Sequence, residues 1–141
     1  MPRVEINLPE RFPFSTELEV RVSDLNYGNH LGNDGVLSLI HEARRRYLRS
    51  LGADEIGADG LGFIIADAAI VYRAQAFYGE RLKLEVAAGE FQSRSLAFHY
   101  RVSKGNGGTV AEARTGVVSF DFKAQRPASI PEDLLARLKQ G

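Results

Sequence analysis

Hydrophobic and polar side chains alternate between Thr16 and Val22, which predicts a strand with one buried face. Three prolines in residues 1–15 predict that the preceding segment is extended and irregular. The apolar positions of the strand are Leu18, Val20 and Val22, and the polar positions are Glu17, Glu19 and Arg21.

A long amphipathic helix is predicted next, with Asn33 or Asp34 as its N-cap and Gly52 just past its end. Gly35 falls in its first turn, where a glycine lets another backbone or a ligand approach closely. Hydrophobic residues recur every three or four positions and form one stripe. The stripe contains Val36, Leu37, Ile40, Ala43, Tyr47, Leu48 and Leu51, with Leu39 off its centre.

Four more strands are predicted, at about residues 63–73, 81–91, 96–103 and 109–122. Because their connections are short, we expect them to pair antiparallel in sequence order, with the clearest hairpin turn at Gly107-Gly108. Pro131, followed by acidic residues and then Lys139, predicts a short terminal helix. The pattern therefore predicts one α+β domain over residues 1–141, with five antiparallel strands and one long helix.

Composition narrows the classes of function. The chain has 141 residues, with 18 basic and 18 acidic side chains, so no overall charge favours nucleic acid or a membrane surface. The absence of cysteine excludes disulfides, thiol nucleophiles and cysteine-bound metal. With no signal-peptide pattern and no apolar run of about 20 residues, we expect a soluble, cytoplasmic protein without membrane insertion.

Packing predicts self-association, because one apolar helix can cover only one face of a sheet. The strands at 63–73 and 109–122 are apolar or small at most positions, and such strands are usually paired or covered. We therefore expect a homodimer or a dimer of dimers (a homotetramer).

A cluster of polar residues joins the first strand to the helix, within eleven positions. Turns use Asn, Asp and Gly for backbone reasons, but the histidine makes this turn the candidate site. Gly28 and Asn29 tolerate unusual backbone angles that could re-aim its side chains. The three histidines show no metal-ligand spacing, so no metal is expected. The cluster consists of Asp24, Asn26, Asn29, His30, Asn33 and Asp34.

This turn, S-D-L-N-Y-G-N-H-L-G-N-D, resembles the signature of hotdog-fold acyl-CoA thioesterases of the 4-hydroxybenzoyl-CoA and acyl-ACP thioesterase-like branch. In that signature an S-D-x-D turn precedes a G-H-V-N-N segment that opens the central helix. Asp24, His30 and Asn33 match it, and H-E-A-R at 41–44 resembles a later helix segment. The resemblance implies a five-stranded sheet wrapped around the helix and hydrolysis of an acyl thioester, with coenzyme A as part of the substrate and no cofactor.

Two positions depart from the signature. The aspartate that is catalytic in the 4-hydroxybenzoyl-CoA branch is Asn26 here, and the first asparagine of V-N-N is Gly32. An amide cannot act as a base, so a carboxylate would come from Asp24, Asp34 or Glu42. Asn26 would then hold substrate or water, and Asp24 would point to the opposite side if the strand continued that far.

The resemblance also suggests roles for other groups. His30 could activate water or polarise the thioester carbonyl, since imidazole changes its charge near neutral pH. Backbone N–H groups near Leu31 to Asp34 could hold the oxyanion. Arg94 would contact the nucleotide, with other cations as further candidates, and Tyr27 is a candidate for the acyl-binding lining. The further cations are Arg73, Arg81 and Arg101, and the other lining candidates are Leu25, Phe63, Phe77 and Tyr78.

Structural roles compete with these assignments. Asn33 and Asp34 could be helix caps, Asp24 could brace the turn through backbone amides, and Glu42 could pair with Arg45 or Arg46 on the helix surface. Two other functions also stay open. One is an enoyl-thioester hydratase or dehydratase, whose D-x-N-P-x-H pattern fits less well, and the other is a non-catalytic acyl-CoA binding module.

Overall fold

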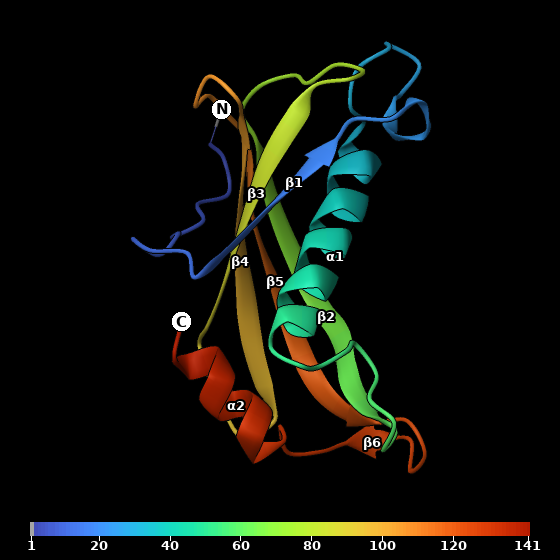
Figure 1. The fold of residues 1–141 in the computed structure, drawn as a ribbon, viewed down its shortest axis with the longest axis vertical. Helices are drawn as coiled ribbons and strands as arrows, with labels where there is room; N and C mark the ends of the chain where they lie inside the picture. The colour runs from blue at the N-terminus through green and yellow to red at the C-terminus, as the bar shows by residue number, and fades with distance from the viewer. Residues whose placement is uncertain (1) are drawn as a thin grey trace.

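The computed structural model describes residues 2–141, and Figure 1 shows a long helix lying along one side of an antiparallel sheet. The two helices and the antiparallel sheet confirm the predicted α+β class. A short 3₁₀ turn, η1 (Val22–Asp24), follows the first strand. The strands are β1 (Phe14–Glu19), β2 (Leu61–Tyr72), β3 (Arg81–Gly89), β4 (Ser95–Lys104), β5 (Thr109–Asp121) and β6 (Arg126–Pro127), and the helices are α1 (Asn33–Ser50) and α2 (Glu132–Lys139).

The strand order is β1-β3-β4-β5-β2, with the two-residue β6 also beside β5. Pairing in sequence order is therefore correct for β3, β4 and β5 and wrong for β2, which pairs with β5 while β1 takes its place beside β3. The 73–80 connection explains the difference, because it is anchored elsewhere. The carbonyl of Ala76 accepts a hydrogen bond from the N–H of Leu31 at 2.8 Å, and Phe77 pairs with His30 in an isolated bridge.

Two other strand predictions need correction. β1 runs from Phe14 to Glu19, so the alternating pattern does not continue to Val22, whose side chain lies in η1 and is 72% exposed. β5 lies between β4 and β2 in the sheet, so it needs no further cover along its edges. Of the two apolar strands expected to need a partner, β2 is the one with a free edge.

Helix α1 begins at Asn33, with Gly32 in the N-cap position and no side-chain capping bond. The prediction of Asn33 or Asp34 as the cap is therefore wrong. Both side chains still satisfy first-turn amides: Asn33 Oδ1 accepts from the N–H of Asp34 at 3.0 Å, and Asp34 Oδ1 accepts from that of Gly35 at 2.9 Å. The helix ends as predicted, with Gly52 in the left-handed region at φ +78°.

The core lies between α1 and the inner face of the sheet. The helix stripe is rotated from the predicted one, because Leu39 is 3% exposed and Leu37 is 43% exposed. Leu37 lies one helical turn after Asn33. The carbonyl of Asn33 accepts a hydrogen bond from the Tyr72 hydroxyl, so this end of α1 lies beside β2. The main core side chains are Val36, Leu39, Ile40, Tyr47, Leu48, Leu82, Leu84, Val86, Phe98, Tyr100, Val102 and Val117.

One buried cation ties the helix to the sheet. Arg44 is 5% exposed; its Nε donates to Glu55 at 3.0 Å and its Nη1 to the Tyr100 hydroxyl at 3.2 Å. Tyr100 in turn shares a 2.7 Å hydrogen bond with Thr115. Burial opposes the charge on Arg44, but the contacts with Tyr100 and Glu55 outweigh it and raise its pKa. Through Glu55, the network thus holds the 53–60 connection against both α1 and the sheet.

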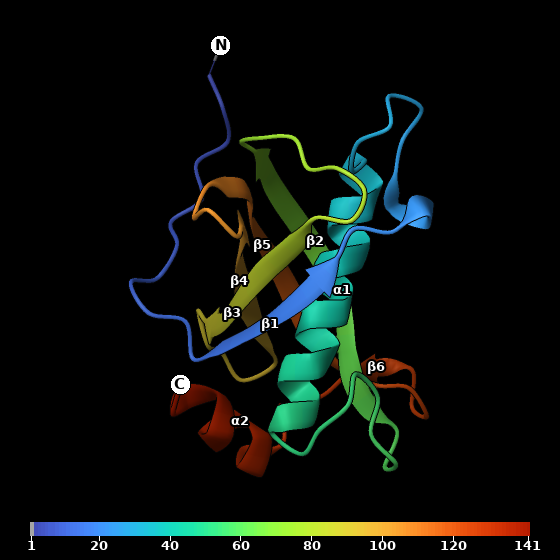
Figure 2. The ribbon, with the colours of Figure 1, turned by 45° about the horizontal axis from the view of Figure 1, so that its top comes forward.

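The outer face of the sheet carries ion pairs, and the N-terminal segment runs along this side, away from α1 (Figure 2). His99 is 9% exposed, and its Nε2 lies 3.2 Å from Glu90 Oε2. Arg114 binds the same carboxylate at 2.8 Å and Asp67 at 3.0 Å. Burial lowers the pKa of His99 more strongly than Glu90 raises it, with Arg114 adding to the lowering. The neutral imidazole is therefore the favoured form here.

Replacing Gly35 with alanine should destabilise the protein. The added Cβ would lie 2.7 Å from the Asp24 carbonyl oxygen and 2.9 Å from Leu31 Cδ1. We expect the free energy of unfolding to fall by about 1–3 kcal/mol, as for other overpacked sites, although alanine favours helix formation. Gly105→Ala is the control, since its Cβ would meet nothing within 4 Å. Equal stability of the two variants in urea would contradict the close approach.

Acid should weaken the protein partly through His99. Because its pKa is lower in the folded state than the ordinary 6.5, the unfolded chain binds the proton more readily. The stability that depends on the neutral imidazole is present above pH 6.5 and is lost as the pH falls below it. His99→Gln should therefore lose less unfolding free energy than the unmodified protein between pH 7.5 and pH 5.5. Parallel pH profiles from urea unfolding would disprove this.

Candidate active site

The candidate site is built on a small loop that joins η1 to α1. Leu25 and Leu31 form an isolated antiparallel bridge, and inside it the N–H of Asn26 donates to the carbonyl of His30 at 2.9 Å. Asn29 adopts the left-handed region at φ +64°, which asparagine tolerates. The tight loop therefore fixes the backbone positions from which the side chains of Asn26 and His30 extend.

The side chain of Asn26 holds this loop closed. Its Oδ1 accepts from the N–H of Gly28 at 2.9 Å and from that of His30 at 3.4 Å. This is the Asx-turn arrangement that makes asparagine common in tight turns. Because Oδ1 is used by the backbone, the Nδ2 donors are the groups that Asn26 can offer to a ligand.

Two glycines let neighbouring side chains lie close to the loop backbone. A Cβ on Gly28 would lie 3.1 Å from His30 Nε2 and 3.3 Å from Asn26 Oδ1. A Cβ on Gly32 would lie 2.6 Å from Asp34 Oδ1 and 3.4 Å from Asn26 Cβ. The side chains of His30 and Asp34 thus take the space that side chains at these two positions would need, and both lie beside Asn26.

Backbone donors at the start of α1 are mostly in use. The N–H of Leu31 donates to Ala76 and that of Gly32 donates to Asp24. Since the amides of Asp34 and Gly35 bind side chains of the first turn, the N–H of Asn33 is left without a hydrogen bond within residues 2–141. Of the predicted Leu31-to-Asp34 amides, it is the one available to a ligand oxygen, at the positive end of the helix dipole.

Asp24 braces the loop. Its carboxylate is buried and accepts from the backbone N–H of Arg21 at 2.8 Å, while the exposed Arg21 Nε lies 3.4 Å away. Its carbonyl accepts from Gly32 at 3.0 Å. The condition under which Asp24 would point away from Asn26, a strand that continues to this position, is not met, because β1 ends at Glu19. The contacts of Asp24 match the bracing role.

Two aromatic residues complete the surroundings. The ring of Phe77 meets the His30 ring edge-on at 6.0 Å between centroids. Tyr72, at the end of β2, donates its hydroxyl to the Asn33 carbonyl at 3.2 Å. Partial burial, with a smaller contribution from the Asp34 carboxylate, raises the pKa of Tyr72. The sequence suggested Phe77 but not Tyr72, because only the β2–β5 pairing brings the end of β2 to the helix.

The other candidates lie apart from Asn26, His30 and Asp34. Glu42 accepts from Arg46 Nε at 2.8 Å, the predicted surface pair, and lies more than two helical turns after Asn33. Arg94 belongs to the β3–β4 turn, where its carbonyl accepts from Ser119. That turn lies at the end of the sheet near α2, away from the start of α1 (Figure 1). Tyr27 is fully exposed at the loop tip. Of the site residues predicted from the sequence, a single chain therefore brings the side chains of Asn26, His30 and Asp34 close together.

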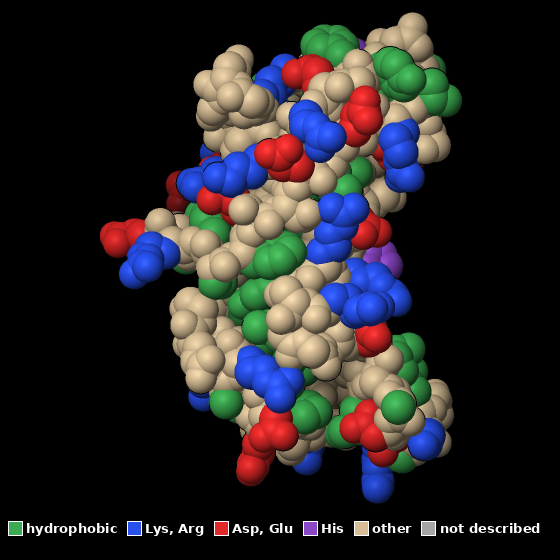
Figure 3. Space-filling model, viewed as in Figure 1, with side chains coloured by type: hydrophobic (Ala, Val, Ile, Leu, Met, Phe, Trp, Pro, Cys, Tyr) green, Lys and Arg blue, Asp and Glu red, His purple; other side chains and the backbone are tan. Residues whose placement is uncertain are grey.

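Exposed hydrophobic side chains lie near the loop that carries Asn26 and His30. Figure 3 shows hydrophobic side chains exposed at the upper end of the molecule, where the 25–31 loop and the 73–80 connection lie. Exposed there are Val22 (72%), Tyr27 (104%), Phe77 (46%) and Tyr78 (66%). Such a patch is typical of a binding surface.

Within residues 2–141, no three His, Asp or Glu side chains gather as metal ligands. Neither described helix is long and apolar enough to cross a membrane.

Comparison with solved structures finds close similarities in fold. The 1,4-dihydroxy-2-naphthoyl-CoA thioesterase of Synechocystis is 20% identical, with a TM-score of 0.82 over 89% of this chain and 95% of that one. A hypothetical protein of Thermus thermophilus is 26% identical, with a TM-score of 0.82 over 89% and 97%. The DHNA-CoA thioesterase of Staphylococcus aureus is 16% identical, with a TM-score of 0.80 over 89% and 90%.

Comparison of the sequence with models of known families identifies a superfamily. A search of curated proteins found no match. The sequence model of the thioesterase-like superfamily matches residues 20–138, a span that runs from the end of β1 to α2 and includes the whole candidate site. The loop that resembles a thioesterase signature, the fold and this match agree, and the chain belongs to the thioesterase-like superfamily.

Proposed function

We propose that this protein hydrolyses an acyl thioester of coenzyme A or of an acyl carrier to a free acid and a thiol. The observation that carries the proposal is the cluster at the start of α1, where glycines at positions 28 and 32 let the side chains of His30 and Asp34 lie beside Asn26. Membership in the superfamily supports the reaction, and the hotdog architecture implied by the resemblance is consistent with a sheet packed against α1.

The chemistry needs an oxyanion donor and a base. In the proposed reaction, the N–H of Asn33 and the Nδ2 of Asn26 donate to the thioester carbonyl oxygen as negative charge develops on it. His30 takes a proton from the attacking water, whose oxygen bonds to the carbonyl carbon. The carbon–sulfur bond then breaks, and the proton passes to the leaving thiolate.

Asp34 is our choice for the carboxylate. Asp24 is buried and bound by the Arg21 N–H, and Glu42 is paired with Arg46, more than two helical turns after the start of α1. Asp34 is exposed and uses Oδ1 for the Gly35 amide. Its second oxygen is therefore free to hold the water or stabilise the charged imidazole.

A second function has a specific observation in its favour. The amide Asn26 stands where the resembling family has its catalytic aspartate, and the Asp24 carboxylate is committed to the turn. A module that binds acyl-CoA without turnover would need only the donors and the apolar surface. Release of thiol distinguishes the two functions, and the chain lacks cysteine, so a thiol reagent gives no background from the protein.

Removing either proposed catalytic side chain should slow hydrolysis. In a thiol-release assay with short, long and aromatic acyl-CoAs, we expect His30→Gln and Asp34→Asn to lower kcat by about 100-fold or more, the usual contribution of a positioned acid or base. His41→Gln and Asp133→Asn, at exposed positions on α1 and α2, are the matched controls. Unchanged kcat in both site variants would refute these roles. Binding without thiol release by the unmodified protein would favour the binding module.

We infer self-association through β2. This strand has 12 residues and lies at one edge of the sheet, so its outer row of backbone groups is unpaired by any strand within residues 2–141. Its hydrophobic residues Ile64, Ile65 and Tyr72 are 38%, 46% and 43% exposed. A second copy would satisfy the edge and cover these side chains, giving the homodimer or the dimer of dimers expected from the sequence.

A charge on β2 should weaken this association. We expect the unmodified protein to show at least twice the chain mass in light scattering, and Ile65→Lys to shift it toward monomer because the charge would be desolvated at the interface. Ile56→Lys, at a similarly exposed position in the 53–60 connection, should leave the mass unchanged. A monomeric unmodified protein would exclude the inferred dimer.

A further inference from the structure

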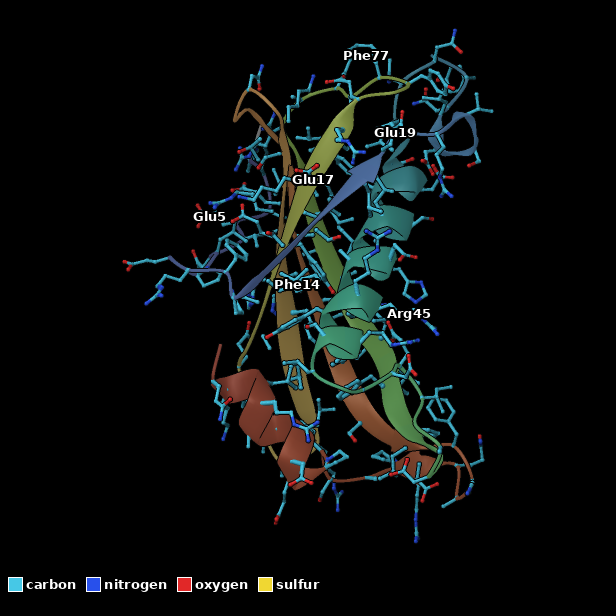
Figure 4. All side chains as sticks on the ribbon, in the orientation of Figure 1. Glu5, Phe14, Glu17, Glu19, Arg45 and Phe77 are labelled. Carbon is cyan, nitrogen blue, oxygen red and sulfur yellow. The ribbon has the colours of Figure 1, made fainter. Side chains whose placement is uncertain are left out.

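One segment, residues 72–77, touches the candidate site at three successive points. Each contact joins a residue of the segment to a residue between His30 and Asn33. Figure 4 shows its last residue, Phe77, at the end of the molecule where α1 begins. The three contacts are Tyr72 with Asn33, Ala76 with Leu31 and Phe77 with His30. Of these, the contact of Tyr72 is the hydrogen bond that a side-chain substitution can remove.

The segment is anchored on the sheet. Tyr72 is the last residue of β2 and is paired with Ala111 of β5. The next two amides, of Arg73 and Ala74, both donate to the carbonyl of Val110, at 2.8 and 3.2 Å. The sheet therefore fixes the base of the Tyr72 side chain, and the hydroxyl at its end carries that position to the helix.

Tyr72 binds the peptide group between Asn33 and Asp34. Its hydroxyl lies 3.2 Å from the Asn33 carbonyl oxygen. The N–H of the same peptide group is also held, because Asn33 Oδ1 accepts from the N–H of Asp34 at 3.0 Å. On one side of this group is the N–H of Asn33, the donor proposed for the thioester oxygen, and on the other is the Asp34 side chain. A shift of this one plane would therefore move both.

The Tyr72 hydroxyl is a donor at neutral pH. Partial burial, and after it the negative charge of the nearby Asp34 carboxylate, raises the pKa of Tyr72 above its ordinary value of 10.0. The phenol therefore keeps its proton. The Asn33 carbonyl is the acceptor that this proton reaches within residues 2–141.

We propose that Tyr72 is a positioning residue of the candidate site: its hydroxyl holds the peptide group between Asn33 and Asp34, and so sets the Asn33 N–H and the Asp34 carboxylate for the ligand. The proposal rests on the proposed thioesterase function and adds a residue that acts through its neighbours. Donors that are fixed in advance stabilise developing charge without having to reorganise. A displacement of about 1 Å in such a group can lower the rate by about 100-fold.

Removing only the hydroxyl tests this role. In the thiol-release assay, Tyr72→Phe should lower kcat by about tenfold, less than the 100-fold or more for loss of an oxyanion donor itself. KM should stay within about twofold, because the lost restraint acts on the transition state. Phenylalanine keeps the ring, so packing at the edge of β2 is retained.

Tyr47→Phe is the matched control. It removes a buried hydroxyl of α1 that has no hydrogen-bond partner within residues 2–141, so kcat and KM should both stay unchanged. The same kcat in the two variants would overturn the proposal. An effect of Tyr72→Phe that is larger on KM than on kcat would also overturn it.

Hydrogen exchange separates this role from the reaction. In NMR measurements the amide of Asp34 should exchange about threefold to tenfold faster in Tyr72→Phe than in the unmodified protein or Tyr47→Phe, the size of one neutral hydrogen bond. If no acyl thioester is hydrolysed but this difference is seen, the proposed function fails and the positioning by Tyr72 stands. If hydrolysis proceeds and all three proteins exchange equally, only the positioning proposal fails. If neither is seen, both fail.

Discussion

The contact between the start of α1 and the carbonyl of Asp24 is the constraint on which the site depends. This oxygen accepts the N–H of Gly32 and lies so close to Gly35 that a Cβ there would be 2.7 Å from it. Two glycines, one turn of helix apart, therefore let the helix backbone rest on η1. The carboxylate of the same residue fixes η1 through the Arg21 amide. Loop and helix are thus one rigid unit, and the positions of Asn26, His30 and Asp34 follow from it.

This constraint explains how a site can persist where the expected aspartate is an amide. Asn26 closes the loop with Oδ1, an acceptor that an aspartate would also provide. An amide here keeps the acceptor that closes the loop, but it replaces the second, charged carboxylate oxygen with an NH2 donor. A carboxylate is still present on the other side of Gly32, from Asp34, because the first helical turn follows the loop directly. The cluster therefore contains a donor, an imidazole and a carboxylate, the three kinds of group that the proposed reaction uses.

Local patterns in the sequence predicted the elements, and long-range pairing decided the rest. The period of the hydrophobic residues located α1 and the four later strands within a few residues, and Gly52 marked the end of the helix. The order of β2 and β3 could not be read in this way, because it is set by pairing between segments far apart in the sequence, β1 with β3 and β2 with β5. Tyr72 was missed for the same reason. The cap was wrongly placed because Asn33 and Asp34 bind the first-turn amides from inside the helix.

The distribution of charge links the two faces of the sheet. The inner face holds one buried cation, Arg44, whose charge is balanced by Glu55 and fixed by Tyr100. On the outer face, cations pair across strands: Arg101 Nε donates to Glu85 at 2.9 Å, and Arg114 Nη2 lies 2.8 Å from Glu90. These pairs join neighbouring strands on one face, and the Arg44 network joins the helix to the sheet on the other. The charged groups therefore hold the two layers in place, whereas the backbone contacts at Asp24 position the candidate site.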